Sequence, residues 1–215
     1  IKKFDELHLE QRTRQQSVLA IGAHPDDVEL GCGASLASHV ARGDRVHILT
    51  LSGGEAGGAV NERAQESRRA AEILGASLTL AELVDTKISE GADTINVIEQ
   101  CIKTVQPQLI YTHSEKDGHQ DHRNAFRATL VAARQVPSVL CYQAPSGTVH
   151  FVPTRFTDIS PFLRKKQEMI AAYASQASIR PYMQIELIEA TARYWGRFAG
   201  YGLCEAFAVI RERSV

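Results

Sequence analysis

Short apolar runs alternate with longer segments of helical composition along most of this chain of 215 residues. The first run, 17–23 (SVLAIGA), has the continuous apolar character of a strand that is buried on both faces. Further strands are predicted at 45–51, 77–83, 108–112, 139–143 and 205–210, and helices at 28–40, 61–74, 94–105, 121–135, 160–177 and 183–201. Strands that alternate with crossover helices predict a mainly parallel sheet with helices on both faces. The predicted fold is therefore α/β and Rossmann-like, with ligands bound beyond the carboxyl ends of the strands.

Length and composition predict one domain over residues 1–215, in which 1–16 form a polar N-terminal extension. The 24 Lys and Arg against 25 Asp and Glu give a net charge of -1, which argues against a nucleic-acid partner. No segment has the apolar length of a membrane span, and 1–16 lack the apolar core of a signal peptide. We therefore expect a cytoplasmic protein. Its four cysteines are widely spaced and form no C-x-x-C motif, so they are expected to be reduced and buried.

Two clusters of histidine and aspartate follow predicted strands. The clusters are His24, Asp26 and Asp27 after the first strand, and His119, Asp121 and His122 after the strand 108–112. Because the carboxyl ends of parallel strands meet at one edge of a sheet, both clusters should lie together. Helix capping alone would explain a pair of aspartates at a helix start, but not the histidines beside them. Two imidazoles and one carboxylate with an open fourth position are typical of a catalytic zinc site.

These stretches resemble the LmbE-like (PIG-L) family of zinc-dependent N-acetylglucosaminyl deacetylases. The resemblance is carried by 23–29 (AHPDDVE) and 118–123 (GHQDHR). Weaker matches are residues 50–55, Arg63 with Glu66, Ser175 with Gln176, and residues 205–207. The resemblance covers most of the chain. It implies a hydrolase that removes an acetyl group from the amine of a small amino-sugar conjugate.

The resemblance also implies a metal centre. His24, Asp27 and His122 would be the ligands of a zinc ion, and Fe(II) would fit the same three ligands. The family further implies assembly as a trimer or hexamer, so a homo-oligomer is expected.

Catalytic roles follow from the same resemblance. Asp26 would be the general base toward a metal-bound water, whose pKa zinc lowers to about 7. His119 would stabilise the oxyanion, most effectively as an imidazolium, and Asp121 would hold His119 in its tautomer. The proton for the leaving amine would come from Asp26 or from His119.

The substrate contacts are expected from Arg63, Glu66 and His113. Arg63 would hold a hydroxyl or acidic group, unless it is a solvent-facing arginine paired with a glutamate of its own helix. The glycine-rich segment 52–58 would line the mouth of the site or act as a mobile lid. Some family members carry a tyrosine before the second motif, where this chain has 115–118 (EKDG). Tyr142 and Tyr173 are the candidates to replace it.

Three other functions fit part of this pattern. A non-haem Fe(II) oxygenase also uses two histidines and a carboxylate, but with His-x-Asp spacing on a barrel strand, whereas this chain has His-x-x-Asp at the start of a helix. An amidase could act on another acylated amine or on a natural-product intermediate. A catalytically silent metal-binding scaffold would keep the site without turnover, but it would not need Asp26 as a non-ligating acid beside the metal.

Overall fold

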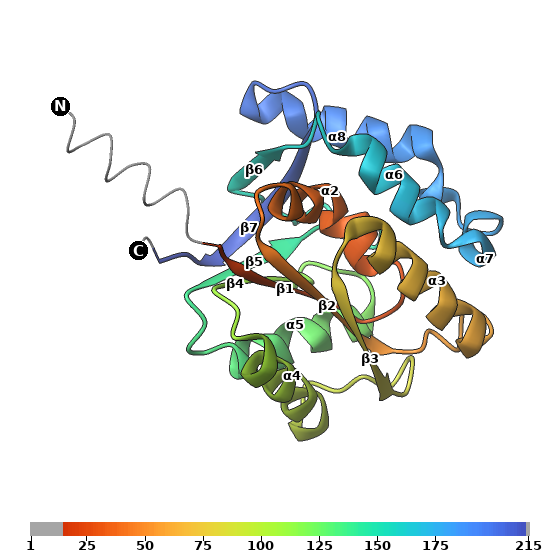
Figure 1. The fold of residues 1–215 in the computed structure, drawn as a ribbon, viewed down its shortest axis with the longest axis vertical. Helices are drawn as coiled ribbons and strands as arrows, with labels where there is room; N and C mark the ends of the chain where they lie inside the picture. The colour runs from red at the N-terminus through yellow and green to blue at the C-terminus, as the bar shows by residue number, and fades with distance from the viewer. Residues whose placement is uncertain (1–14, 214–215) are drawn as a thin grey trace.

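The computed structural model describes residues 15–213, which form an α/β fold around one seven-stranded sheet (Figure 1). The strands are β1 (Ser17–Gly22), β2 (Arg45–Ser52), β3 (Ser77–Leu83), β4 (Leu109–Thr112), β5 (Ser138–Tyr142), β6 (Arg155–Asp158) and β7 (Cys204–Arg211). Their order across the sheet is β3-β2-β1-β4-β5-β7-β6. The first five strands are parallel, and β7 is antiparallel to β5 and β6. The predicted mainly parallel sheet is confirmed.

Helices cover both faces of this sheet (Figure 1). They are α2 (Asp27–Ala41), α3 (Val60–Leu74), α4 (Ala92–Val105), α5 (Gln120–Ala132), α6 (Leu163–Ala171), α7 (Ala174–Ala177), the 3-10 helix η1 (Pro181–Met183) and α8 (Ile185–Ala199). Strand β1 contributes side chains to the core on each face of the sheet, because alternate side chains of a strand point to opposite faces. Val18 and Ala20 pack in the core beneath α2, α3 and α6, whereas Leu19 and Ile21 pack in the core beneath α4 and α5. This two-sided burial explains the continuous apolar run.

Two segments differ from the prediction. Strand β6 lies between the predicted strand 139–143 and the predicted helix 160–177, where no strand was predicted, and it is an edge strand that pairs with β7. The predicted helix 160–177 is divided into α6 and α7, because Tyr173 leaves helical geometry with φ -88° and ψ 57°. The predicted N-terminal extension 1–16 lies outside the described residues except for its last two.

The topology brings the two predicted clusters to one edge of the sheet. Strand β1 pairs with β4 in parallel, from Val18 opposite Leu109 to Ala20 opposite Tyr111. The chain passes from β1 to α2 and from β4 to α5 at the carboxyl ends of these strands. Both turns therefore open on the same side of the molecule, as the alternation of strands and helices predicts.

The four cysteines, Cys32, Cys101, Cys141 and Cys204, are free and buried, as predicted. Within residues 15–213, no helix combines the length and the apolar character needed to cross a membrane.

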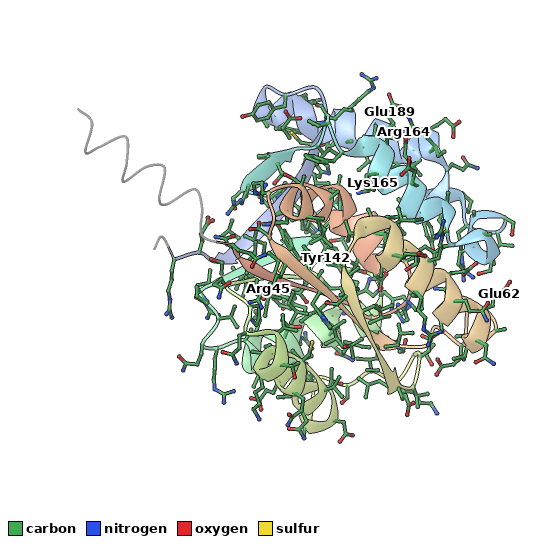
Figure 2. All side chains as sticks on the ribbon, in the orientation of Figure 1. Arg45, Glu62, Tyr142, Arg164, Lys165 and Glu189 are labelled. Atoms are coloured by element: carbon green, nitrogen blue, oxygen red, sulfur yellow. The ribbon has the colours of Figure 1, made fainter. Side chains whose placement is uncertain are left out.

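Helix α2 packs closely against the sheet at Gly31. A Cβ atom at this position would lie 2.1 Å from Cδ2 of Tyr142, a fully buried side chain that is labelled in Figure 2. The Tyr142 hydroxyl donates a hydrogen bond to the carbonyl of Ile21 at 2.8 Å, which holds the ring in place. The absence of a side chain at Gly31 therefore sets the distance between α2 and the sheet.

We expect Gly31→Ala to lower the free energy of unfolding by about 1–3 kcal/mol, because the ring of Tyr142 or the helix must move. Urea denaturation followed by circular dichroism measures the change. Gly33→Ala is the matched control on the same helix, since its Cβ would meet a flexible methionine side chain (Cε of Met169) at 3.0 Å. Equal stability of the two variants would contradict the packing argument.

Candidate metal centre and active site

The first cluster lies in the turn between β1 and α2. Asp26 occupies the position before α2 with φ 93°, a left-handed conformation that aspartate and asparagine adopt more readily than most residues. The backbone N–H of His24 donates a hydrogen bond to Oδ2 of Asp27 at 2.7 Å. This tight turn directs the side chains of His24, Asp26 and Asp27 toward the carboxyl end of β4.

The predicted ligand set is brought together. Nδ1 of His24 lies 3.3 Å from Oδ2 of Asp27, and Nε2 of His122 lies 3.3 Å from Oδ1 of Asp27 and 3.3 Å from Nδ1 of His24. Ligands at about 2.0–2.1 Å from a tetrahedral zinc ion lie about 3.3 Å from one another. The three residues therefore fit a common divalent ion.

The electrostatics of this group also favour a cation. Burial lowers the pKa of His24, but hydrogen bonds to three carboxylates outweigh this effect and raise the pKa to about 12. These carboxylates are those of Asp121, Asp27 and Asp85. Burial likewise lowers the pKa of His122, and the neighbouring carboxylates raise it to about 9. A site that binds protons this strongly has an excess of negative charge, which a divalent ion would balance.

In His24 and His122, the ring nitrogen that faces away from the shared site contacts a carboxylate, and this contact orients the ring. Nε2 of His24 lies 3.2 Å from Oδ2 of Asp121 and 3.0 Å from Oδ1 of Asp85. Nδ1 of His122 lies 3.1 Å from Oδ2 of Asp117. Such outer partners hold the imidazole of a metal ligand in the required tautomer. They leave Nδ1 of His24 and Nε2 of His122 directed at the same point.

Asp85 and Asp117 were missed by the sequence analysis. Asp85 follows the carboxyl end of β3, and Asp117 precedes α5. The signal that could have found them is their position, since both are acidic residues in loops at the same edge of the sheet as the two clusters.

Asp117→Asn is expected to weaken metal binding by about 10–100-fold, the usual effect of removing the outer partner of a ligating histidine. Oδ1 of Asp117 also accepts hydrogen bonds from the N–H of His119 at 2.8 Å and from the hydroxyl of Ser146 at 2.6 Å. Competition with a chelator measures the affinity. Glu115→Gln, which neutralises an exposed carboxylate in the same loop, should bind the metal as the parent does. Equal affinities of the two variants would contradict a role for Asp117.

Asp26 is buried beside the ligand set and lines the cavity above it. Burial raises its pKa, as does the Asp27 carboxylate, whereas the guanidinium of Arg63 acts in the opposite direction. Nη2 of Arg63 donates hydrogen bonds to the carbonyl of Pro25 at 2.6 Å and to Oδ2 of Asp26 at 3.3 Å. Arg63 is itself buried, with 3% of its surface exposed, so the solvent-facing alternative is wrong. This arginine is placed to hold the turn and the Asp26 carboxylate.

His119 precedes α5 and also lines the cavity. Its Nδ1 accepts a hydrogen bond from the backbone N–H of Asp121 at 3.2 Å, so the neutral ring carries its hydrogen on Nε2. Burial lowers the pKa of His119, and so do the rings of His122 and His24, which favours the neutral form over the expected imidazolium. The Asp121 carboxylate faces His24 and accepts from the N–H of Thr86 at 2.7 Å. The predicted contact of this carboxylate with His119 is thus replaced by a backbone contact.

Two of the predicted substrate contacts lie away from the cavity. Both carboxylate oxygens of Glu66 are used by Ser175, accepting from its N–H at 2.7 Å and from its hydroxyl at 2.8 Å. Glu66 therefore anchors the start of α7. His113 is fully buried beneath the ligand set, where its ring stacks on His122 with centroids 3.9 Å apart and its Nε2 lies 3.2 Å from Oδ2 of Asp27. It contacts two residues of the predicted ligand set.

Neither tyrosine considered as a replacement acid reaches the cavity. The hydroxyl of Tyr142 donates to the carbonyl of Ile21 in β1, and the hydroxyl of Tyr173 donates to the buried carboxylate of Glu29 at 3.0 Å. Tyr182, on η1, is the tyrosine that lines the cavity.

The cavity above the ligand set has a volume of about 360 Å³. The glycine-rich segment forms part of its wall through Gly54, Ala56 and Gly57, as predicted. This segment is tied on two sides, since the N–H of Ala56 donates to Oδ2 of Asp85 at 2.9 Å and Nε2 of Gln176 donates to the carbonyl of Gly57 at 3.1 Å.

Comparison with known proteins places the chain in a family. The PIG-L family, described as GlcNAc-PI de-N-acetylase, matches residues 19–133, which include both clusters. The uncharacterized deacetylase YaiS of Escherichia coli (strain K12) is 36% identical over 166 residues, which cover 74% of this chain and 90% of YaiS. The chain belongs to the PIG-L family.

The proteins that are similar to this chain differ in the reaction that their names describe. The 4-oxalmesaconate hydratase of Pseudomonas putida is 28% identical over 200 residues, which cover 79% of this chain and 78% of the hydratase. Among solved structures, the conserved protein TT1542 from Thermus thermophilus has a TM-score of 0.83 and 28% identity, covering 94% of this chain and 97% of that protein.

Proposed function

We propose that this PIG-L family protein is a metal-dependent hydrolase that removes the acetyl group from the amine of a small amino-sugar conjugate. The observation that carries the proposal is the mutual 3.3 Å spacing of ligand atoms from His24, Asp27 and His122, beside an Asp26 carboxylate that is not part of that set. The name of the E. coli relative and the description of the family support deacetylation.

Zinc is the proposed ion, and Fe(II) suits the same two imidazoles and one carboxylate. When bound, zinc polarises a carbonyl oxygen and lowers the pKa of water to about 7.

The chain's own groups would supply the proton transfers. Asp26 accepts a proton from the water that attacks the amide carbonyl, and then returns this proton to the leaving amine. Burial keeps the Asp26 carboxylate basic, and Arg63 holds it in position. His119 donates from Nε2–H to the oxygen on which negative charge develops, an interaction that strengthens as the transition state forms.

The remaining walls of the cavity suit a sugar. Ser146, Gln176 and Arg180 line it with hydroxyl, amide and guanidinium groups that can hydrogen-bond to sugar hydroxyls. A polar rim around the metal centre would orient the conjugate with its acetyl group toward Asp26.

A hydratase is the second candidate, and the P. putida relative favours it. It would use the same base and the same cavity, but the water would add to a carbon–carbon double bond of an unsaturated acid.

A mass-spectrometric screen tests the proposal. Zinc-loaded protein is incubated with N-acetylated amino-sugar conjugates and, separately, with unsaturated dicarboxylic and tricarboxylic acids. We expect loss of an acetyl mass from at least one conjugate and no such loss with Asp26→Asn protein. Gain of a water mass by an unsaturated acid, without deacetylation, would replace the proposal by the second candidate. Zinc-loaded protein that changes neither panel would contradict both.

A further inference from the structure

A second cavity, of about 260 Å³, adjoins the catalytic cavity. Leu30, Pro145 and Tyr182 line both, so they form the boundary at which one cavity gives way to the other. From this boundary the second cavity extends between α8 and the first residues of β7. A substrate seated over the metal centre would have this second space directly beside it.

The lining of the second cavity is largely apolar. Ile188 and Ala192 contribute from the buried side of α8, and Ile159 of the lining is fully buried. Leu187 of the lining has 48% of its surface exposed, and Pro145 is also exposed. The exposed part of the lining is therefore mainly apolar, with Thr191 as its polar member, an arrangement typical of a site for an apolar group.

The charged groups at its floor already satisfy one another. Nζ of Lys166 donates to Oε1 of Glu205 at 2.6 Å and to the carbonyl of Leu30 at 2.7 Å. Oε2 of Glu205 accepts from the N–H of Ser35 at 2.7 Å. Because this pair is buried and hydrogen-bonded, the floor carries no net charge that would require an ionic ligand.

We infer that the second cavity holds an apolar group of the substrate, an alkyl or aryl substituent covalently linked to the acylated amino sugar. The inference rests on the proposed function and narrows its substrate class. Two parts of such a molecule have the required chemistry, an acyl chain longer than acetyl or an apolar aglycone on the sugar. Either would pass the boundary at Tyr182 and remove apolar surface from water.

Two homologous series of compounds test the inference and separate the two sources. One series carries N-acyl chains from acetyl to octanoyl on glucosamine, and the other carries alkyl glycosides from methyl to octyl on N-acetylglucosamine. We expect kcat/KM of the zinc-loaded protein to rise in one series by up to about fourfold per methylene until the cavity is full. Turnover of both series without such a rise in either would overturn the inference.

Binding measured by calorimetry keeps the test independent of turnover. Asp26→Asn protein loaded with zinc should bind the longest member of at least one series more tightly than the shortest member of that series. Failure to deacetylate any compound, together with length-dependent binding, would reject the proposed function and keep the apolar site. Length-independent binding would reject the site.

A pair of tryptophan substitutions on α8 locates the effect. Thr191 is exposed and lines the second cavity, so Thr191→Trp should fill it and remove the dependence on chain length. Ala190→Trp places the same bulk on an exposed neighbouring position outside the lining and should retain that dependence. A dependence that survives in Thr191→Trp would show that the chain binds elsewhere.

Discussion

Replacing Asp26 by asparagine is expected to leave the metal in place and to slow turnover by about 10²-fold or more. Asparagine has nearly the same shape as aspartate and adopts the left-handed backbone conformation found at this position, with φ 93°. It cannot accept the proton of the attacking water. The three ligand atoms of His24, Asp27 and His122 are unchanged, so the affinity for the ion should stay close to that of the parent.

Metal content and kcat, measured on the same preparation, test this expectation. Asp93→Asn, at an exposed position in the first turn of α4, is the matched control and should behave as the parent. Full turnover by Asp26→Asn would remove Asp26 from the role of base. Loss of the metal in this variant would instead place Asp26 among the groups that hold the ion.

His122→Ala is expected to abolish both metal binding and turnover. Nε2 of His122 lies 3.3 Å from ligand atoms of both His24 and Asp27, so its removal leaves two ligands instead of three. A zinc site with two protein ligands is incomplete, and the water-activating chemistry is lost with the ion.

Metal analysis after dialysis, together with an activity assay, measures the effect. His150→Ala removes an exposed imidazole and serves as the control. A melting curve for each variant separates loss of the ion from loss of the fold, since His122 also stacks on the buried ring of His113. One ion bound per chain of His122→Ala would contradict the ligand assignment.

The alternation of apolar runs and helical segments was enough to predict the architecture, because each central strand is buried on two faces and leaves a strong sequence signal. Strand β6 was missed since an edge strand of four residues (RFTD) is partly exposed and lacks an apolar run. The break between α6 and α7 has neither glycine nor proline to mark it. It coincides with Tyr173, whose hydroxyl donates a hydrogen bond to Glu29 of α2. These two residues are far apart in the sequence, so no local pattern predicts the contact.

The candidate site, like the fold, was predicted only in part. The resemblance of 23–29 and 118–123 to the PIG-L family indicated His24, Asp27 and His122 as the ligands, and the parallel sheet brings them together. The contacts that orient these histidines could not be predicted from local sequence. Asp85 comes from the end of β3, and Asp121 reaches His24 rather than His119, which no local pattern indicates.

The amino-acid sequence alone predicts the class of fold, the edge of the sheet that carries the candidate site, and the two clusters of histidine and aspartate that meet there. These follow from periodicity and from residue type, which are local properties of the chain. Tertiary contacts place Glu66 and His113 outside the cavity, direct Arg63 toward Asp26 and form a second, largely apolar cavity beside the first. The direction and the burial of a side chain depend on which distant segments pack against it, so local sequence patterns do not predict them.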